Sequence, residues 1–248
     1  MLSRLLLFGL VIAALPAHAQ QVRVIRFDES IPFRMGEVTS RRIVHPGLGA
    51  KKTTLNLSIS QPGAEFAQHV HDYSDDTILV LDGEVNLRQG DSLRLFKSGE
   101  CAFVPTGQIH GTVTAGNGDT VMISFQNPPD LVLYSGARDS KRTGIAPKGV
   151  ITPGAVKFVN FRERNGAFTS AALGAMRGTG LRHLLKPGEK LRAKVPASGE
   201  HIFFVWRGAI ASSTQTAGER DTIFITGPAD IEVTATAPDT EVIQVNAP

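Results

Sequence analysis

Three histidines and one aspartate of this chain have the residue types and the spacing of a metal site. His69 and His71 are two residues apart, so on a strand both side chains point to the same face. Asp76 opens the next apolar run, and His110 follows the turn Pro105-Thr106-Gly107. Three neutral imidazoles and a carboxylate form an N3O set that suits a divalent metal and leaves coordination positions open. The sequence therefore predicts a metal site built from His69, His71, Asp76 and His110.

Other residues near this set have weaker signals. Tyr73 lies two residues beyond His71, where it fits a proton donor or a substrate hydrogen-bond partner at the mouth of a site, and fits an exposed loop position equally well. Strand alternation turns Asp75 to the face opposite Asp76. His45 and His183 are interpreted as ordinary polar positions. The single cysteine, Cys101, is interpreted as a small buried hydrophobe.

The elements that must position these residues are short strands. Apolar and β-branched runs recur between turns rich in Gly and Asp, at residues 53–60, 77–81, 85–87, 101–104 and 121–125. Short strands at this spacing predict an all-β sandwich or barrel. Residues 167–176 are the one stretch where a helix is plausible, and a strand fits them equally well.

The strand pattern occurs twice. Residues 186–188 and 203–208 match earlier residues at an offset of 125, and 233–235 match 113–115 at an offset of 120. Three short matches in the same order predict an internal duplication. We therefore expect an N-terminal domain over 20–135, a linker rich in Pro, Gly and charge over 136–153, and a second domain over 154–248.

The second copy is expected to lack the metal site. At these offsets the four candidate ligand positions hold Lys194, Pro196, His201 and Asp230. Proline has no ligating side-chain atom, and a lysine ammonium repels a divalent cation. The second copy is therefore expected to contribute stability and part of the pocket wall. A minor alternative is that His201, beside Glu200, lines a second pocket.

The candidate ligands and the glycines around them resemble the two sequence motifs of the cupin superfamily. In the first motif, G(X)5HXH(X)3–4E(X)6G, Asp76 stands where glutamate is usual. In the second, G(X)5PXG(X)2H(X)3N, Thr114 stands where asparagine is usual. The positions that match are Gly63, His69, His71, Gly83, Gly99, Pro105, Gly107 and His110.

This resemblance implies an all-β fold of two tandem jelly-roll barrels, a bicupin with a degenerate C-terminal copy. It implies a divalent ion, with Fe, Mn, Zn and Ni all open. Because aspartate is one methylene shorter than glutamate, Asp76 is either a direct ligand or a partner that reaches the metal through water.

The leading functional hypothesis is an exported, metal-dependent bicupin enzyme that acts on a small oxygenated molecule. Its reaction is dioxygenase-type, or that of a lyase, isomerase or decarboxylase. The alternative is a non-catalytic periplasmic cupin that binds a sugar or small acid, and a third hypothesis is a structural bicupin with a vestigial metal. A buried acid or base beside the metal, other than the ligands, would distinguish the enzyme from the two non-catalytic hypotheses, because general acid–base catalysis requires such a group within ~3 Å of the substrate.

Composition limits the partners. Of 248 residues, 42% are hydrophobic and 20% are charged, which suits a globular protein with a large core. The net charge is only +3 and no dense basic cluster exists, so nucleic acid is not expected as a partner. One cysteine excludes an intrachain disulfide framework. A small-molecule ligand is expected, and a homodimer is left open.

The N-terminus has the pattern of a cleaved signal peptide over 1–19. Arg4 precedes an apolar run over 5–15, and Ala17 and Ala19 fit a cleavage site before Gln20. The run is about half the ~20 residues that a membrane-spanning helix needs. We therefore expect a periplasmic or secreted protein without a membrane segment after cleavage.

Overall fold

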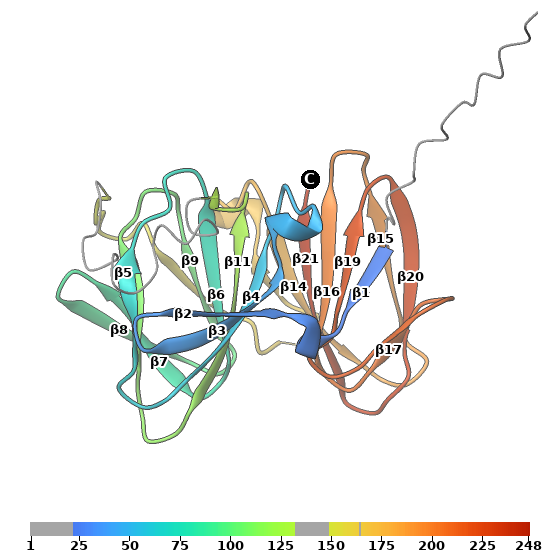
Figure 1. Cartoon of the computed structure of the whole chain (residues 1–248), viewed down its shortest axis with the longest axis horizontal. Coiled ribbons are helices and arrows are strands. Elements are labelled where there is room, and N and C mark those ends of the chain that lie inside the picture. Colours follow the sequence, from blue (N-terminus) through green and yellow to red (C-terminus); the bar gives the residue numbers. More distant parts are fainter. Residues whose placement is uncertain (1–21, 132–148, 164) are drawn as a thin grey trace, which may run out of the picture.

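The computed structural model describes residues 22–131, 149–163 and 165–248. The expected signal peptide and residues 136–148 of the expected linker lie outside these ranges. Strands make up most of the described chain and form two barrels side by side (Figure 1), which confirms the predicted all-β, jelly-roll class. Within the described residues, three short 3-10 helices lie between consecutive strands, at Phe27–Glu29, Pro46–Leu48 and Ala171–Leu173.

The first barrel consists of a seven-stranded and a four-stranded sheet. The larger sheet has the order β12-β9-β6-β11-β4-β3-β2, with bounds Lys157–Asn160, Glu100–Val104, Asp75–Asp82, Thr120–Asn127, Leu55–Ser60, Val38–Val44 and Ile31–Met35. The smaller sheet has the order β5-β10-β7-β8, with bounds Glu65–His69, His110–Thr114, Glu84–Gln89 and Ser92–Lys97.

The second barrel repeats this plan with six and four strands. Its larger sheet has the order β1-β19-β16-β21-β14-β13, with bounds Val22–Ile25, Thr222–Thr226, Glu200–Arg207, Thr240–Ala247, Thr179–Leu185 and Ala167–Thr169. Its smaller sheet has the order β15-β20-β17-β18, with bounds Lys190–Val195, Ala229–Ala235, Ile210–Ala211 and Thr216–Ala217. Residues 167–176 form β13 followed by a 3-10 helix.

Each barrel receives an edge strand from the other half of the chain. β1, the first described strand, pairs with β19 in the second barrel. β12, which follows the expected linker, pairs with β9 in the first barrel. The two halves of the sequence are therefore joined by exchanged strands as well as by packing.

Strand alternation explains why the central strands are apolar on both faces. In β6, Ile78 and Val80 point into the first barrel, whereas Leu79 and Leu81 point to a core shared by both barrels. That shared core also contains Phe204 of β16, so the two larger sheets pack against each other. Strands that are buried on both faces appear as nearly continuous hydrophobic runs.

A one-residue bulge in β5 aims the candidate ligands inward. Thr112 pairs with Phe66 but His110 pairs with His69, so β5 advances three residues while β10 advances two. The chains approach closely here: a Cβ on Gly111 would lie 2.7 Å from the carbonyl oxygen of Phe66. A side chain at position 111 is therefore incompatible with the bulge.

No helix among the described residues is long and apolar enough to cross a membrane.

Candidate metal centre

The structure brings the four predicted ligands together inside the first barrel. Their potential ligating atoms all lie within 4.8 Å of one another, and all four residues are buried. The Nε2 atoms of His69 and His71 are 3.1 Å apart. Asp76 Oδ2 lies 3.3 Å from Nε2 of His110 and 3.5 Å from Nε2 of His71.

The outward nitrogen of each ring is held by a hydrogen-bond acceptor. Nδ1 of His69 donates to the Ala67 carbonyl at 2.9 Å, and Nδ1 of His110 donates to the Gln108 carbonyl at 3.0 Å. Nδ1 of His71 is 2.7 Å from a carboxylate oxygen of Asp130. These contacts fix the ring orientation and direct each Nε2 to the common centre, as in other histidine metal sites.

The cluster fits a divalent ion. Two ligand atoms ~2.1 Å from one metal lie ~3.0 Å apart at a right angle and ~3.4 Å apart at the tetrahedral angle. The Nε2 and Oδ2 separations of 3.1, 3.3 and 3.5 Å match this range. Asp76 Oδ1 is buried and has no hydrogen-bond partner in the structure, so the carboxylate is not satisfied by protein alone. The arrangement puts an Asp76 oxygen close enough to the histidine nitrogens for direct coordination of a bound ion, where the sequence left its role open.

The charges of the cluster are strongly coupled. Burial, followed by the nearby His110 and His71, holds the pKa of His69 well below its usual range. Burial opposes the charged form of His71, but hydrogen bonds to Asp130 and Asp76 outweigh it and raise the pKa of His71 to about 9. Burial also opposes the charged form of Asp76, but hydrogen bonds from His110 and His71 lower its pKa. Without metal, these hydrogen bonds therefore favour the protonated form of His71.

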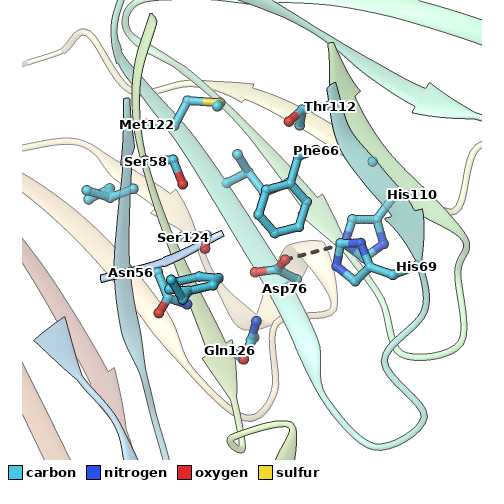
Figure 2. A pocket seen from close by; sticks show the side chains of 14 residues that line it. Asn56, Ser58, Phe66, His69, Asp76, His110, Thr112, Met122, Ser124 and Gln126 are labelled. Carbon is cyan, nitrogen blue, oxygen red and sulfur yellow. Dashed lines mark hydrogen bonds and ion pairs between the residues drawn. The ribbon is translucent and has the colours of Figure 1, made fainter. Parts of the chain in front are cut away.

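A cavity adjoins the cluster (Figure 2). It leaves about 40 Å³ for the centres of water-sized molecules, where one water needs ~10–15 Å³. One part of its wall is apolar, with Phe33, Phe66, Ile78 and Met122. Another is polar, with Asn56 and Ser58 from β4 and Ser124 and Gln126 from β11. Only a small molecule, or a small part of one, fits beside the ligands.

Two residues beside the candidate ligands escaped the sequence analysis. Asp130 lies three residues beyond the end of β11, and no sequence pattern shows that it folds back onto His71. Gln126 pairs with Asp76 in the sheet register, and its buried Oε1 has no hydrogen-bond partner in the structure. Gln126 could have been identified only from the pairing register of β6 and β11, which places it opposite Asp76.

The structure does not bring Tyr73 into the cavity. Its side chain is 80% exposed, and it lies on a separate surface groove with Asp130. Asp75 faces away from the cluster and accepts hydrogen bonds from the backbone and hydroxyl of Thr106. His45 accepts a hydrogen bond from the Gly47 backbone. Cys101 is fully buried, and burial raises the pKa of its thiol to about 12.

The expected equivalences in the second barrel are wrong at three positions. β15 and β20 pair without a bulge, so Leu191 opposite Val233 corresponds to Phe66 opposite Thr112. The next inward pair, at the place of His69 and His110, is Ala193 and Ile231, not Lys194 and Asp230. Val195, not Pro196, takes the place of His71 on the inward face. His201 does stand at the place of Asp76, because His201 opposite Asn246 matches Asp76 opposite Gln126. The second barrel therefore has hydrocarbon where the first has imidazole.

Comparisons with known proteins agree with this geometry. The family model for the cupin domain matches residues 56–125, the part of the chain that contains all four candidate ligands. Residues 56–125 of the chain are therefore a cupin domain. Protein SchB of Streptomyces halstedii is 25% identical to this cupin over 139 residues, which cover 54% of the chain and 98% of SchB.

Two solved structures share the fold of both barrels. A bacterial pirin of Escherichia coli, YhhW, crystallised with nickel(II), has a TM-score of 0.67 and 16% identity, covering 92% of this cupin and 99% of the pirin. Oxalate decarboxylase of Bacillus subtilis, a protein with Mn(II) centres, has a TM-score of 0.64 and 12% identity, covering 90% of this cupin and 76% of the decarboxylase. At these identities the likeness concerns the fold alone.

Proposed function

We propose that this cupin is an exported, metal-dependent enzyme that acts on a small oxygenated molecule by oxygenase-type chemistry. The observation that carries the proposal is the buried N3O cluster beside a small, largely apolar cavity. A bound Fe, Mn or Ni ion would supply Lewis-acid and redox chemistry, and Zn would supply Lewis-acid chemistry alone. Nickel and manganese, the metals of the pirin and the oxalate decarboxylase, are the first to test.

The cavity wall supports oxygenase chemistry over proton transfer. Among the described residues, the titratable groups that line it are three candidate ligands, His69, Asp76 and His110. A lyase, isomerase or decarboxylase that depends on a protein acid or base needs such a group within ~3 Å of its substrate. The polar wall instead offers neutral amides and hydroxyls. In this proposal Gln126 orients the substrate by hydrogen bonding, and Phe33 and Phe66 exclude water.

Metal analysis and oxygen consumption test the proposal together. The protein is purified from the exported fraction, its metal content is measured, and chelated protein is reloaded anaerobically with Fe(II), Mn(II), Ni(II) or Zn(II). Oxygen uptake is then recorded with phenolic and organic-acid substrates, with His110→Ala as the variant that lacks a ligand. We expect about one metal per chain and oxygen uptake that requires metal, substrate and His110. Stoichiometric metal and tight substrate binding without turnover would instead support the non-catalytic binding hypothesis.

Export is tested separately. The proposal places the mature protein in the periplasm or outside the cell, beginning at Gln20. Amino-terminal sequencing of protein from periplasmic and culture fractions checks this cleavage site. A chain that keeps Met1 and stays with the cytoplasmic fraction contradicts it. The size of the purified protein in solution tests the homodimer, which is also still a prediction.

A further inference from the structure

A short segment at the end of the expected linker, residues 149–152, lies against the loop that leads to His110. The loop, residues 105–109, connects β9 to β10, whereas the segment precedes β12. Val150 forms a parallel bridge with Gln108, in which its N–H and its carbonyl each make a 2.9 Å hydrogen bond to a residue beside Gln108. The backbone of the segment therefore holds the backbone of the loop.

The Gln108 side chain adds a second link to this segment. It is buried, and its Oε1 accepts a hydrogen bond from the Thr152 N–H at 2.8 Å. Its Nε2 donates to the Thr152 hydroxyl at 3.2 Å. The Gln108 carbonyl accepts from Nδ1 of His110 at 3.0 Å. Gln108 therefore connects the segment to the ring of a candidate ligand, because its side chain is held by Thr152 and its backbone holds His110.

The loop is fixed at every backbone polar group of residues 107–109. The Gly107 N–H donates to the His71 carbonyl at 2.8 Å, which ties the loop to a second candidate ligand. The partners of these six N–H and carbonyl groups are Val150 for two of them, and His71, Pro105, His110 and Gln89 for one each. The conformation of the loop therefore depends on the segment for two of its six backbone bonds.

Gly149 packs against the sequence neighbours of all three histidines. A Cβ at this position would lie 2.6 Å from Cγ1 of Ile109 and 2.9 Å from Cγ2 of Val70. Val70 separates the first two histidines in the sequence, and Ile109 immediately precedes the third. A glycine at position 149 lets the backbone of the segment approach both side chains this closely.

We propose that the segment 149–152 sets the positions of the histidine rings at the metal centre, with Gln108, Gly149 and Thr152 as positioning residues. The inference rests on the proposed function, because it requires a metal ion in the cluster. Displacement of the segment would move the loop, and with it the Nε2 of His110. Such a shift changes the coordination geometry without removing a ligand.

Cobalt(II) bound to the full chain is the probe, because its visible absorption depends on the number and arrangement of its ligands. Gly149→Ala should weaken Co(II) binding at least about tenfold and change its spectrum, since outer contacts of metal ligands contribute on this scale. Gln108→Met keeps the length of the side chain, loses both bonds to Thr152 and should do the same. Thr152→Val loses only the hydroxyl, at an exposed position, and should have a smaller effect.

Gly199→Ala is the matched control in the second barrel. Its Cβ would lie 2.8 Å from two side-chain carbons of Pro196, so it crowds its surroundings much as Gly149→Ala does, and neither glycine has a left-handed φ. It should lower the stability to urea as Gly149→Ala does. It should leave the Co(II) affinity and spectrum unchanged.

Three results would overturn the inference. Wild-type Co(II) affinity and spectrum in both Gly149→Ala and Gln108→Met would do so and leave the metal centre of the proposed function intact. An equal spectral change in Gly199→Ala would do so because the effect would then follow from stability alone. A wild-type chain that binds no Co(II) would overturn the proposed function together with this inference.

Discussion

Metal binding to the cluster should displace the proton of His71 and should weaken as the pH falls. The metal takes the Nε2 position of His71, whose pKa is raised to about 9 by Asp130 and Asp76 against the effect of burial. His69 and Asp76, whose pKa values are both lowered, contribute no proton near neutral pH. Proton and metal therefore compete at one ring.

The size of this effect follows from the pKa of His71. With a pKa of about 9, about half of the metal-free molecules have an unprotonated His71 at pH 9, and about one in 1,000 does at pH 6. The apparent affinity should therefore fall about 500-fold over this interval, which corresponds to about 3.7 kcal/mol. Above pH 9.5 the affinity should reach a plateau.

A competition titration measures this dependence. Metal is partitioned between the protein and a chromophoric chelator of known pH-dependent affinity, at half-unit steps from pH 6 to pH 9.5. Asp130→Asn is the matched variant: it removes the charge that raises the pKa of His71, so its plateau should begin at lower pH. An affinity that is flat between pH 7 and pH 8.5 refutes the protonation of His71. An identical profile in Asp130→Asn refutes the role of Asp130.

Four further substitutions test the structure. His71→Ala should reduce metal content at least about tenfold, and Asp76→Ala should reduce it comparably because its Oδ2 lies within the ligand set; a much smaller loss in Asp76→Ala would assign it an outer role. Gly111→Ala should destabilise by about 1–3 kcal/mol in urea unfolding, since the new methyl lies 2.7 Å from a backbone oxygen; unchanged stability would contradict the bulge. Glu200→Gln should lower the unfolding free energy by about 2 kcal/mol, because a buried charged acceptor of three backbone N–H groups is lost, while metal content stays the same.

The ligands of the first barrel were predictable because local spacing determines them. Two histidines at i and i+2 share a face of an extended chain, and both reach the cluster although β5 ends at His69 and His71 lies just beyond it. Asp76 lies on the face of Ile78 and Val80 by simple alternation. None of these inferences requires knowledge of which strands are neighbours. Asp130 was not predictable, because its contact with His71 joins residues 59 positions apart outside the strand pattern.

Two of the three errors in the second barrel, at Lys194 and Pro196, arise from one residue, whereas the error at Asp230 arises because the offset of 120 is one residue short for β20. A constant offset assumes that both copies of a strand have the same length, but β5 contains a bulge that β15 lacks. One residue of slip moves every side chain to the opposite face, which turns Lys194 outward and Ala193 inward. Gly111 was the available signal, because the register places Glu232, a residue with a side chain, at the corresponding position. The exchange of β1 and β12 is a pairing between distant edges, and no local pattern encodes it.

The two barrels also hold each other at corresponding loops, which gives the second barrel a role at the metal centre. Glu200 of β16 binds the loop at 51–53 of the first half. In the reverse direction, Arg177 lies 3.8 Å from Asp75 and donates to the Tyr73 carbonyl at 2.7 Å and to the Thr106 hydroxyl at 2.8 Å. Tyr73 follows His71 closely and Thr106 precedes His110. Arg177 therefore connects the loop after His71 to the loop before His110. Because Arg177 is about half exposed, these contacts contribute more to position than to stability. A barrel with a hydrocarbon interior can therefore still determine the geometry of its partner's metal ligands.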